Sequence, residues 1–257
     1  VQNDLDWALE KYTEALQLAE KNELDDIIIG LTINIGAVYF DKEDYAQALD
    51  HYVTANELNE KLGDRESMAS IYGNIGIVHL KLGDVDNAIS NIEKSSAFYK
   101  DLELTESYAL QLQNLAGIYG ASGRIAEARQ KFNEVLEIYE GIGHKSGLAG
   151  IKLNLATFEV NFGDSLKGAE LAEQCIELFS ELESPVMEAK AMMVLGTSLT
   201  KQSQFEKADE LYNDAFDTLI KFNSKNLLAQ GYKNYTALLY RSKEFERAVN
   251  VLHKSVQ

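Results

Sequence analysis

The residues that most often perform chemistry, cysteine and histidine, are few in this sequence and lie far apart. Cys175 is the single cysteine, so the sequence cannot form an internal disulfide or a cysteine cluster around a metal. The four histidines, His51, His79, His144 and His253, show no spacing typical of a catalytic or metal motif. We therefore predict no catalytic residue, no metal ligand and no cofactor, and expect this segment not to be an enzyme.

Asparagine is the polar residue that recurs at a regular interval. Five asparagines occupy equivalent places in a 40-residue pattern: Asn34, Asn74, Asn114, Asn154 and Asn234. Asparagine is a mediocre helix former, so its recurrence inside apolar helical stretches needs a reason. An amide can donate and accept at once, which suits the N–H and C=O groups of a bound peptide. Two alternatives stay open: these amides bond neighbouring helices, or they are inherited through repeat duplication.

The whole sequence follows the same 40-residue period, which indicates a repeat array rather than one globular core. The stretch from Ile33 to Tyr39, with Asn, aliphatic, small and aromatic residues in order, returns in each repeat. A second series keeps the same step and consists of Ala48, Ala88, Ala128, Gly168, Ala208 and Ala248.

Helix-period apolar patterns fill almost the entire chain, and the one proline, Pro185, falls where a helix begins. We predict thirteen helices: a lone leading helix within 1–24, then helix pairs. The predicted repeats are 25–64, 65–104, 105–144, 145–184, 185–224 and 225–257. Connections this short make neighbouring helices antiparallel. Gly83, Gly123 and Gly163 are expected in the left-handed conformation that ends a helix.

The small residues of the two helices should allow close approach, with aromatic side chains beside them. Repeat 145–184 departs from this pattern, because it has Glu159 and Ala172 where other repeats have aromatic residues, and Gly168 in place of alanine. We expect this repeat to pack least well and to open first.

These patterns resemble the tetratricopeptide repeat family. Its first-helix pattern appears as Ile35-Gly36 with Tyr39, and its second-helix pattern as Ala48-Tyr52-Ala55. The resemblance covers nearly the whole chain and implies an all-α, right-handed α-solenoid of about six and a half repeats. The family's usual period is 34 residues, so a period of 40 is similar to its long-helix variants.

The resemblance also implies that the first helices of the repeats line a concave groove and that the five asparagines face it. Four basic residues gather toward the C-terminal end of that groove: Lys190, Lys201, Lys233 and Arg241. Basic side chains within an acidic protein favour a protein or peptide ligand with an acidic segment.

The net charge of −17 argues against nucleic acid or an anionic membrane as partner, since both favour a positive surface. The longest apolar run, 27–40, is too short to span a bilayer, so we expect no direct membrane insertion of this segment. The sequence begins at Val1 and ends inside a repeat, so we expect a piece of a longer protein.

We predict a non-catalytic scaffold that binds a partner protein or peptide in the groove, located in the cytoplasm. The alternative is the sensory domain of a bacterial membrane signalling protein, such as a histidine kinase or a diguanylate cyclase, with a periplasmic location also open. A third reading is a homodimer formed through the array ends, because the outer helices of an array expose apolar faces.

Overall fold

The computed structural model describes residues 2–254, and the regular elements in that range are thirteen α-helices, as predicted. They are α1 (Gln2–Lys21), α2 (Asp25–Asp41), α3 (Tyr45–Leu62), α4 (Arg65–Lys81), α5 (Val85–Asp101), α6 (Thr105–Ala121), α7 (Ile125–Gly141), α8 (Lys145–Phe162), α9 (Ser165–Glu181), α10 (Pro185–Lys201), α11 (Phe205–Lys221), α12 (Lys225–Arg241) and α13 (Phe245–Lys254). Within these residues, no helix is long and apolar enough to cross a membrane.

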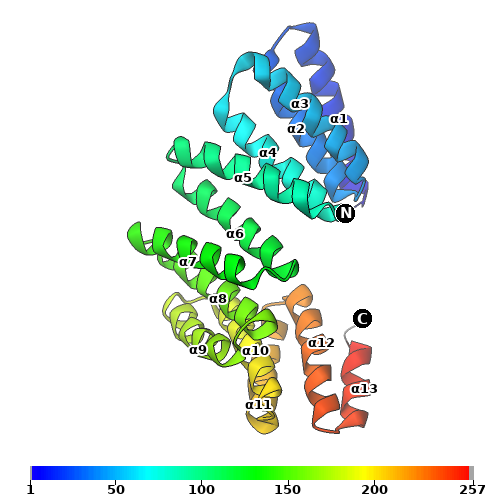
Figure 1. Ribbon diagram of the computed structural model, residues 1–257. Helices are drawn as coiled ribbons and strands as arrows, with labels where there is room; N and C mark the ends of the chain where they lie inside the picture. The colour runs from blue at the N-terminus through cyan, green and yellow to red at the C-terminus, as the bar shows by residue number, and fades with distance from the viewer. Residues whose placement is uncertain (1, 255–257) are drawn as a thin grey trace. The chain divides into compact units, whose positions relative to one another are not determined.

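The helices form an α-solenoid (Figure 1). The chain divides into two compact units, residues 1–131 and 132–257. In the first unit, α1 to α6 pack in sequence. In the second unit, α8 to α13 do the same, and α10 also contacts both α8 and α12 directly. In the second unit, the first helices of the repeats are α8, α10 and α12. These three first helices therefore lie side by side.

Small residues allow the two helices of a pair to approach closely, as the sequence predicts. A Cβ atom added to Gly36 would lie 2.8 Å from the Tyr52 ring, and one added to Gly196 would lie 2.9 Å from the Tyr212 ring. The second-helix alanines are buried, as at Ala128. Each tyrosine therefore packs directly on a glycine of its partner helix.

The loops repeat as regularly as the helices. From residue 23 to residue 243, every twentieth residue except 163 has a positive φ. Gly83 and Gly123 adopt this left-handed conformation, with φ of 80° and 77°, as expected. Aspartates such as Asp84 and Asp164 then cap the next helix by accepting hydrogen bonds from its first backbone N–H groups.

The prediction for Gly163 is wrong, because this residue has φ −114° and ψ −129°. In the other first-helix loops, the backbone N–H of the residue just before the second helix donates to a main-chain carbonyl, as Asp84 does to His79 at 2.9 Å. Here the N–H of Asp164 donates instead to the side-chain Oε2 of Glu159, also at 2.9 Å. The Glu159 carboxylate thus replaces the carbonyl that a left-handed turn would supply.

The expected loose packing of repeat 145–184 is also not observed. Glu159 and Ala172 are fully buried, and Phe158 supplies an aromatic ring 5.3 Å from Phe132. A Cβ atom on Gly168 would lie 2.8 Å from the backbone nitrogen of Val160. The missing side chains therefore leave no gap, because α8 and α9 approach to backbone contact.

Candidate functional site

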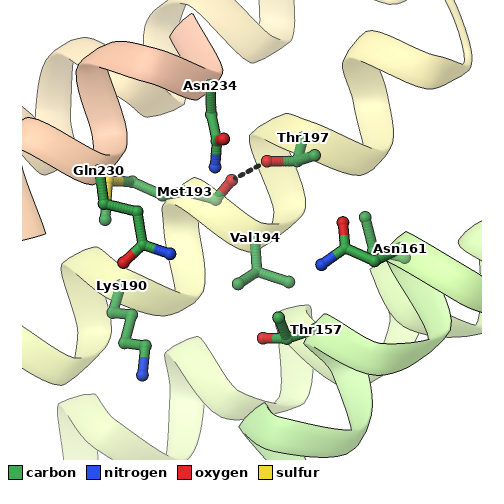
Figure 2. Close-up of a pocket in the computed structure, with 9 residues that line it drawn as sticks. Thr157, Asn161, Lys190, Met193, Val194, Thr197, Gln230 and Asn234 are labelled. Carbon is green, nitrogen blue, oxygen red and sulfur yellow. Dashed lines mark hydrogen bonds between the residues drawn. The ribbon is translucent and has the colours of Figure 1, made fainter. Parts of the chain in front are cut away.

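The first helices of the second unit form a pocket of about 130 Å³ (Figure 2). Its lining comes from α8, α10 and α12. The lining residues are Thr157, Val160, Asn161, Lys190, Met193, Val194, Thr197, Gln230 and Asn234. The pocket therefore brings together two residues predicted from the sequence, Lys190 and Asn234.

Helical periodicity places these side chains on one surface. Lys190, Val194 and Thr197 are spaced i, i+4 and i+7 along α10, and Gln230 and Asn234 are spaced i and i+4 along α12. Residues at this spacing share a helix face. Because α10 lies against both of its first-helix neighbours, the three faces adjoin.

The two threonine hydroxyls of the pocket are already hydrogen-bonded within the protein. Thr157 donates to the carbonyl of Leu153 at 2.8 Å. Thr197 lies 2.9 Å from both the carbonyl of Met193 and the hydroxyl of Tyr212. Burial raises the pKa of Tyr212 to about 12, so its phenol stays protonated and this contact persists at neutral pH.

Four polar side chains of the pocket have no hydrogen bond or ion pair with any residue in 2–254. They are the Lys190 ammonium and the amides of Asn161, Gln230 and Asn234. Lys190 is the one cation among the residues lining the pocket. The pocket can therefore offer amide donors, amide acceptors and one positive charge to a ligand.

The other predicted asparagines lie on first helices but outside this pocket. Asn34, Asn74 and Asn114 lie on α2, α4 and α6 of the first unit, where Asn34 is exposed and the other two are half-buried. Asn114 donates weakly to Gln111 at 3.4 Å. Asn154 is exposed on α8.

Three of the predicted basic residues lie outside the pocket lining. The Lys201 ammonium donates to the carbonyl of Val160, and Arg241 donates to the carbonyl of Thr200 at 3.3 Å. Each of these side chains thus binds the C-terminal end of the preceding first helix, where the helix dipole favours a cation. Lys233 is exposed on α12.

Several lining residues were missed from the sequence, although the signal for them was present. Asn161 stands seven residues after Asn154, two helical turns along the same face. Gln230 stands one turn before Asn234. The 40-residue series marks a single position in each repeat, whereas the pocket also uses positions one or two helical turns away.

Comparison with known proteins identifies the repeat. The tetratricopeptide repeat profile matches residues 27–101 and 67–141. Residues beyond 141 continue the same 40-residue period and helix-pair fold. Residues 27–141 are therefore tetratricopeptide repeats, and proteins built from this repeat are typically non-catalytic scaffolds.

One relative is the Arabidopsis thaliana protein KINESIN LIGHT CHAIN-RELATED 2, which is 31% identical over 107 residues. That match covers 41% of this chain and only 16% of the relative, so no activity or partner of the whole relative follows from it.

Solved structures share the fold at low sequence identity. The tetratricopeptide repeat sensor protein of the STAND ATPase class from Pyrococcus horikoshii superposes with a TM-score of 0.78 at 18% identity, covering 96% of this chain and 38% of that one. The Rap conjugation regulator of plasmid pLS20, solved with the Phr* peptide, has a TM-score of 0.68 at 16% identity. It covers 92% of this chain and 64% of that one.

Proposed function

We propose that this chain is a non-catalytic module that binds an extended peptide segment of a partner protein on the face formed by α8, α10 and α12. The observation that carries this proposal is the convergence of Lys190, Asn161, Gln230 and Asn234, from three helices, without partners inside the protein.

Amide side chains are suited to peptide backbone, because each can accept from an N–H group and donate to a C=O group at once. The amides lie on the two outer helices, Asn161 on α8 and Asn234 on α12, with α10 between them (Figure 2). An extended chain lying along α10 would have an amide available on each of its edges. The Rap regulator named above supports the idea, since the same kind of fold was solved with a peptide.

We further propose that the ligand carries an acidic group near Lys190. The surrounding sequence adds positive charge, because residues 225–257 contain six basic and two acidic residues within a chain of net charge −17. Such a field would steer an acidic segment toward this end of the chain. In this proposal Lys201 and Arg241 contribute mainly to the positive electrostatic potential around the pocket, since both already bind main-chain carbonyls.

The asparagines of α2, α4 and α6 are proposed to bind a further stretch of ligand with the same amide chemistry. The side chains of Asn34 and Asn74 make no hydrogen bond within the described residues. Their contribution is expected to be smaller than that of Asn234, because no cation accompanies them in a pocket.

The test is calorimetric titration of a partner identified by affinity capture. Asn234→Ala should weaken binding about two- to tenfold, the value of one lost hydrogen bond. Asn226→Ala is the matched control, because Asn226 lies on the same helix, is exposed and does not line the pocket. Equal affinities for both variants and the unchanged protein would remove this face from the binding site.

A sensory role is the second candidate, favoured by the fold similarity to the Pyrococcus horikoshii sensor protein. In that case the same pocket would bind the signal, and an output domain such as a histidine kinase or diguanylate cyclase would belong to the same polypeptide. The full-length coding sequence discriminates between the two: an output domain supports the sensor, and an array without one supports the scaffold.

A further inference from the structure

The residue at the centre of the pocket breaks the asparagine series. Val194 occupies the place that is asparagine in the other five repeats, at 34, 74, 114, 154 and 234. It is half-buried, and Figure 2 shows it between Asn161 on one side and Asn234 on the other. The one apolar residue of the series therefore lies where amides flank it on both sides.

The pocket beside Val194 suits a small aliphatic group. Met193, which also lines the pocket, is buried, and both threonine hydroxyls are bound to carbonyls of their own helices. A cavity of about 150 Å³ is large enough for benzene, so about 130 Å³ accepts a side chain of valine size.

The distance between Lys190 and Val194 along α10 matches the distance between alternate side chains of an extended peptide. Lys190 and Val194 are four residues apart, which is about 6 Å along a helix axis. Alternate side chains of an extended chain point to the same side and lie about 6.6 Å apart. A peptide lying along α10 can therefore direct one side chain to Lys190 and another to Val194 only if a single peptide residue separates the two.

The edges of such a peptide are also accounted for. Its N–H and C=O groups point sideways, perpendicular to the side chains, toward α8 and α12. Asn161 lies on the first of these helices, and Gln230 and Asn234 lie on the second. All four unpartnered polar groups of the pocket then have a role.

Resting on the proposed function, we infer that Val194 fixes the ligand register and that the bound motif is an acidic residue and a small aliphatic residue separated by one residue. The acidic side chain meets the Lys190 ammonium, and the aliphatic side chain occupies the pocket at Val194. The chain direction of the ligand is left to the experiment, since either direction presents this spacing.

The test begins with selection of binders from a displayed library of random dodecapeptides against the whole protein. A selected sequence is then made as three blocked synthetic peptides, with zero, one or two residues between the acidic and aliphatic positions. We expect the one-residue spacing to bind about tenfold more tightly than the others, because a shifted side chain points away from the pocket and loses its apolar burial.

Protein variants provide the second arm. Lys190→Glu should remove the preference for the acidic residue, and Val194→Asn should remove the preference for the aliphatic one. Lys167→Glu, an exposed change on α9 outside the pocket, should leave both preferences unchanged. Circular dichroism of each variant confirms that the helices are intact.

The outcomes separate this inference from the function on which it rests. Peptides that lose affinity with Asn234→Ala, yet bind equally at all three spacings, would overturn the motif and retain the binding face. Selected peptides unaffected by Asn234→Ala, Lys190→Glu and Val194→Asn would overturn both.

Discussion

Two glycines of one repeat, Gly168 and Gly150, should respond in opposite ways to the same substitution. Gly168 lies in α9, where an added Cβ would be 2.8 Å from the Val160 backbone nitrogen and 3.0 Å from the Ala156 carbonyl oxygen. Gly150 lies in α8, where an added Cβ meets no atom within 4 Å. The first substitution forces two backbones apart, and the second fills open space.

The magnitudes follow from two terms. Replacing a helical glycine by alanine stabilises the helix by about 1 kcal/mol, and this gain applies to both sites. Overpacking costs typically about 1–3 kcal/mol, and this cost applies only to Gly168→Ala. The obstructing atoms are main-chain atoms, which cannot rotate away, so the cost should fall in the upper part of that range.

Gly150→Ala should therefore raise the free energy of unfolding by about 1 kcal/mol, and Gly168→Ala should lower it by about 1–2 kcal/mol. Urea unfolding followed by circular dichroism measures both, and hydrogen exchange in α8 and α9 shows whether the change is local. If Gly168→Ala stabilises the protein as Gly150→Ala does, the two helices are not in backbone contact and the account of this repeat is wrong.

Three further predictions concern the loops, the core and the thiol. Ser203→Gly should stabilise by up to about 1 kcal/mol and Gly83→Ala should destabilise by about 1–2 kcal/mol in urea titrations, because both positions have positive φ; equal small effects would contradict the loop assignment. Ala128→Leu should lower the free energy of unfolding by about 1–3 kcal/mol and Glu127→Leu by less than about 0.5 kcal/mol. The reason is that the alanine is fully buried and the Glu127 side chain is half-exposed. Similar urea midpoints for the two variants would contradict the assignment of Ala128 to the buried face of α7. Burial raises the pKa of the Cys175 thiol to about 12, so at pH 8 the thiol is protonated and should react with a disulfide reagent only when the protein unfolds; rapid labelling of the native protein would refute its burial.

The fold could be predicted from the sequence because each repeat supplies the same information again. The alanine at 48 and its equivalents identify the face of the second helix, and the single proline leaves every helix uninterrupted. Gly163 could not be predicted, since its conformation depends on a hydrogen bond from Asp164 to the Glu159 side chain, which no local pattern reveals.

The candidate site could be predicted only in part. Lys190 and Asn234 follow from charge and periodicity, and both line the pocket. Lys201 and Arg241 have the same sequence signal, yet they bind main-chain carbonyls one repeat earlier. Whether a basic side chain is used internally depends on which carbonyl lies within its reach, and this is a property of the packed helices.

The most direct test of the central claim is photocross-linking of a selected peptide by benzoylphenylalanine placed at a single position. At position 154 the probe lies on the exposed face of α8, two helical turns from Asn161 and outside the pocket lining, so its rings do not fill the pocket. Position 250, an exposed site on α13, lies outside the face formed by α8, α10 and α12. We expect a cross-link from 154 and none from 250, abolished at 154 by excess unlabelled peptide. A cross-link from 250 and none from 154 would contradict binding on the face formed by α8, α10 and α12.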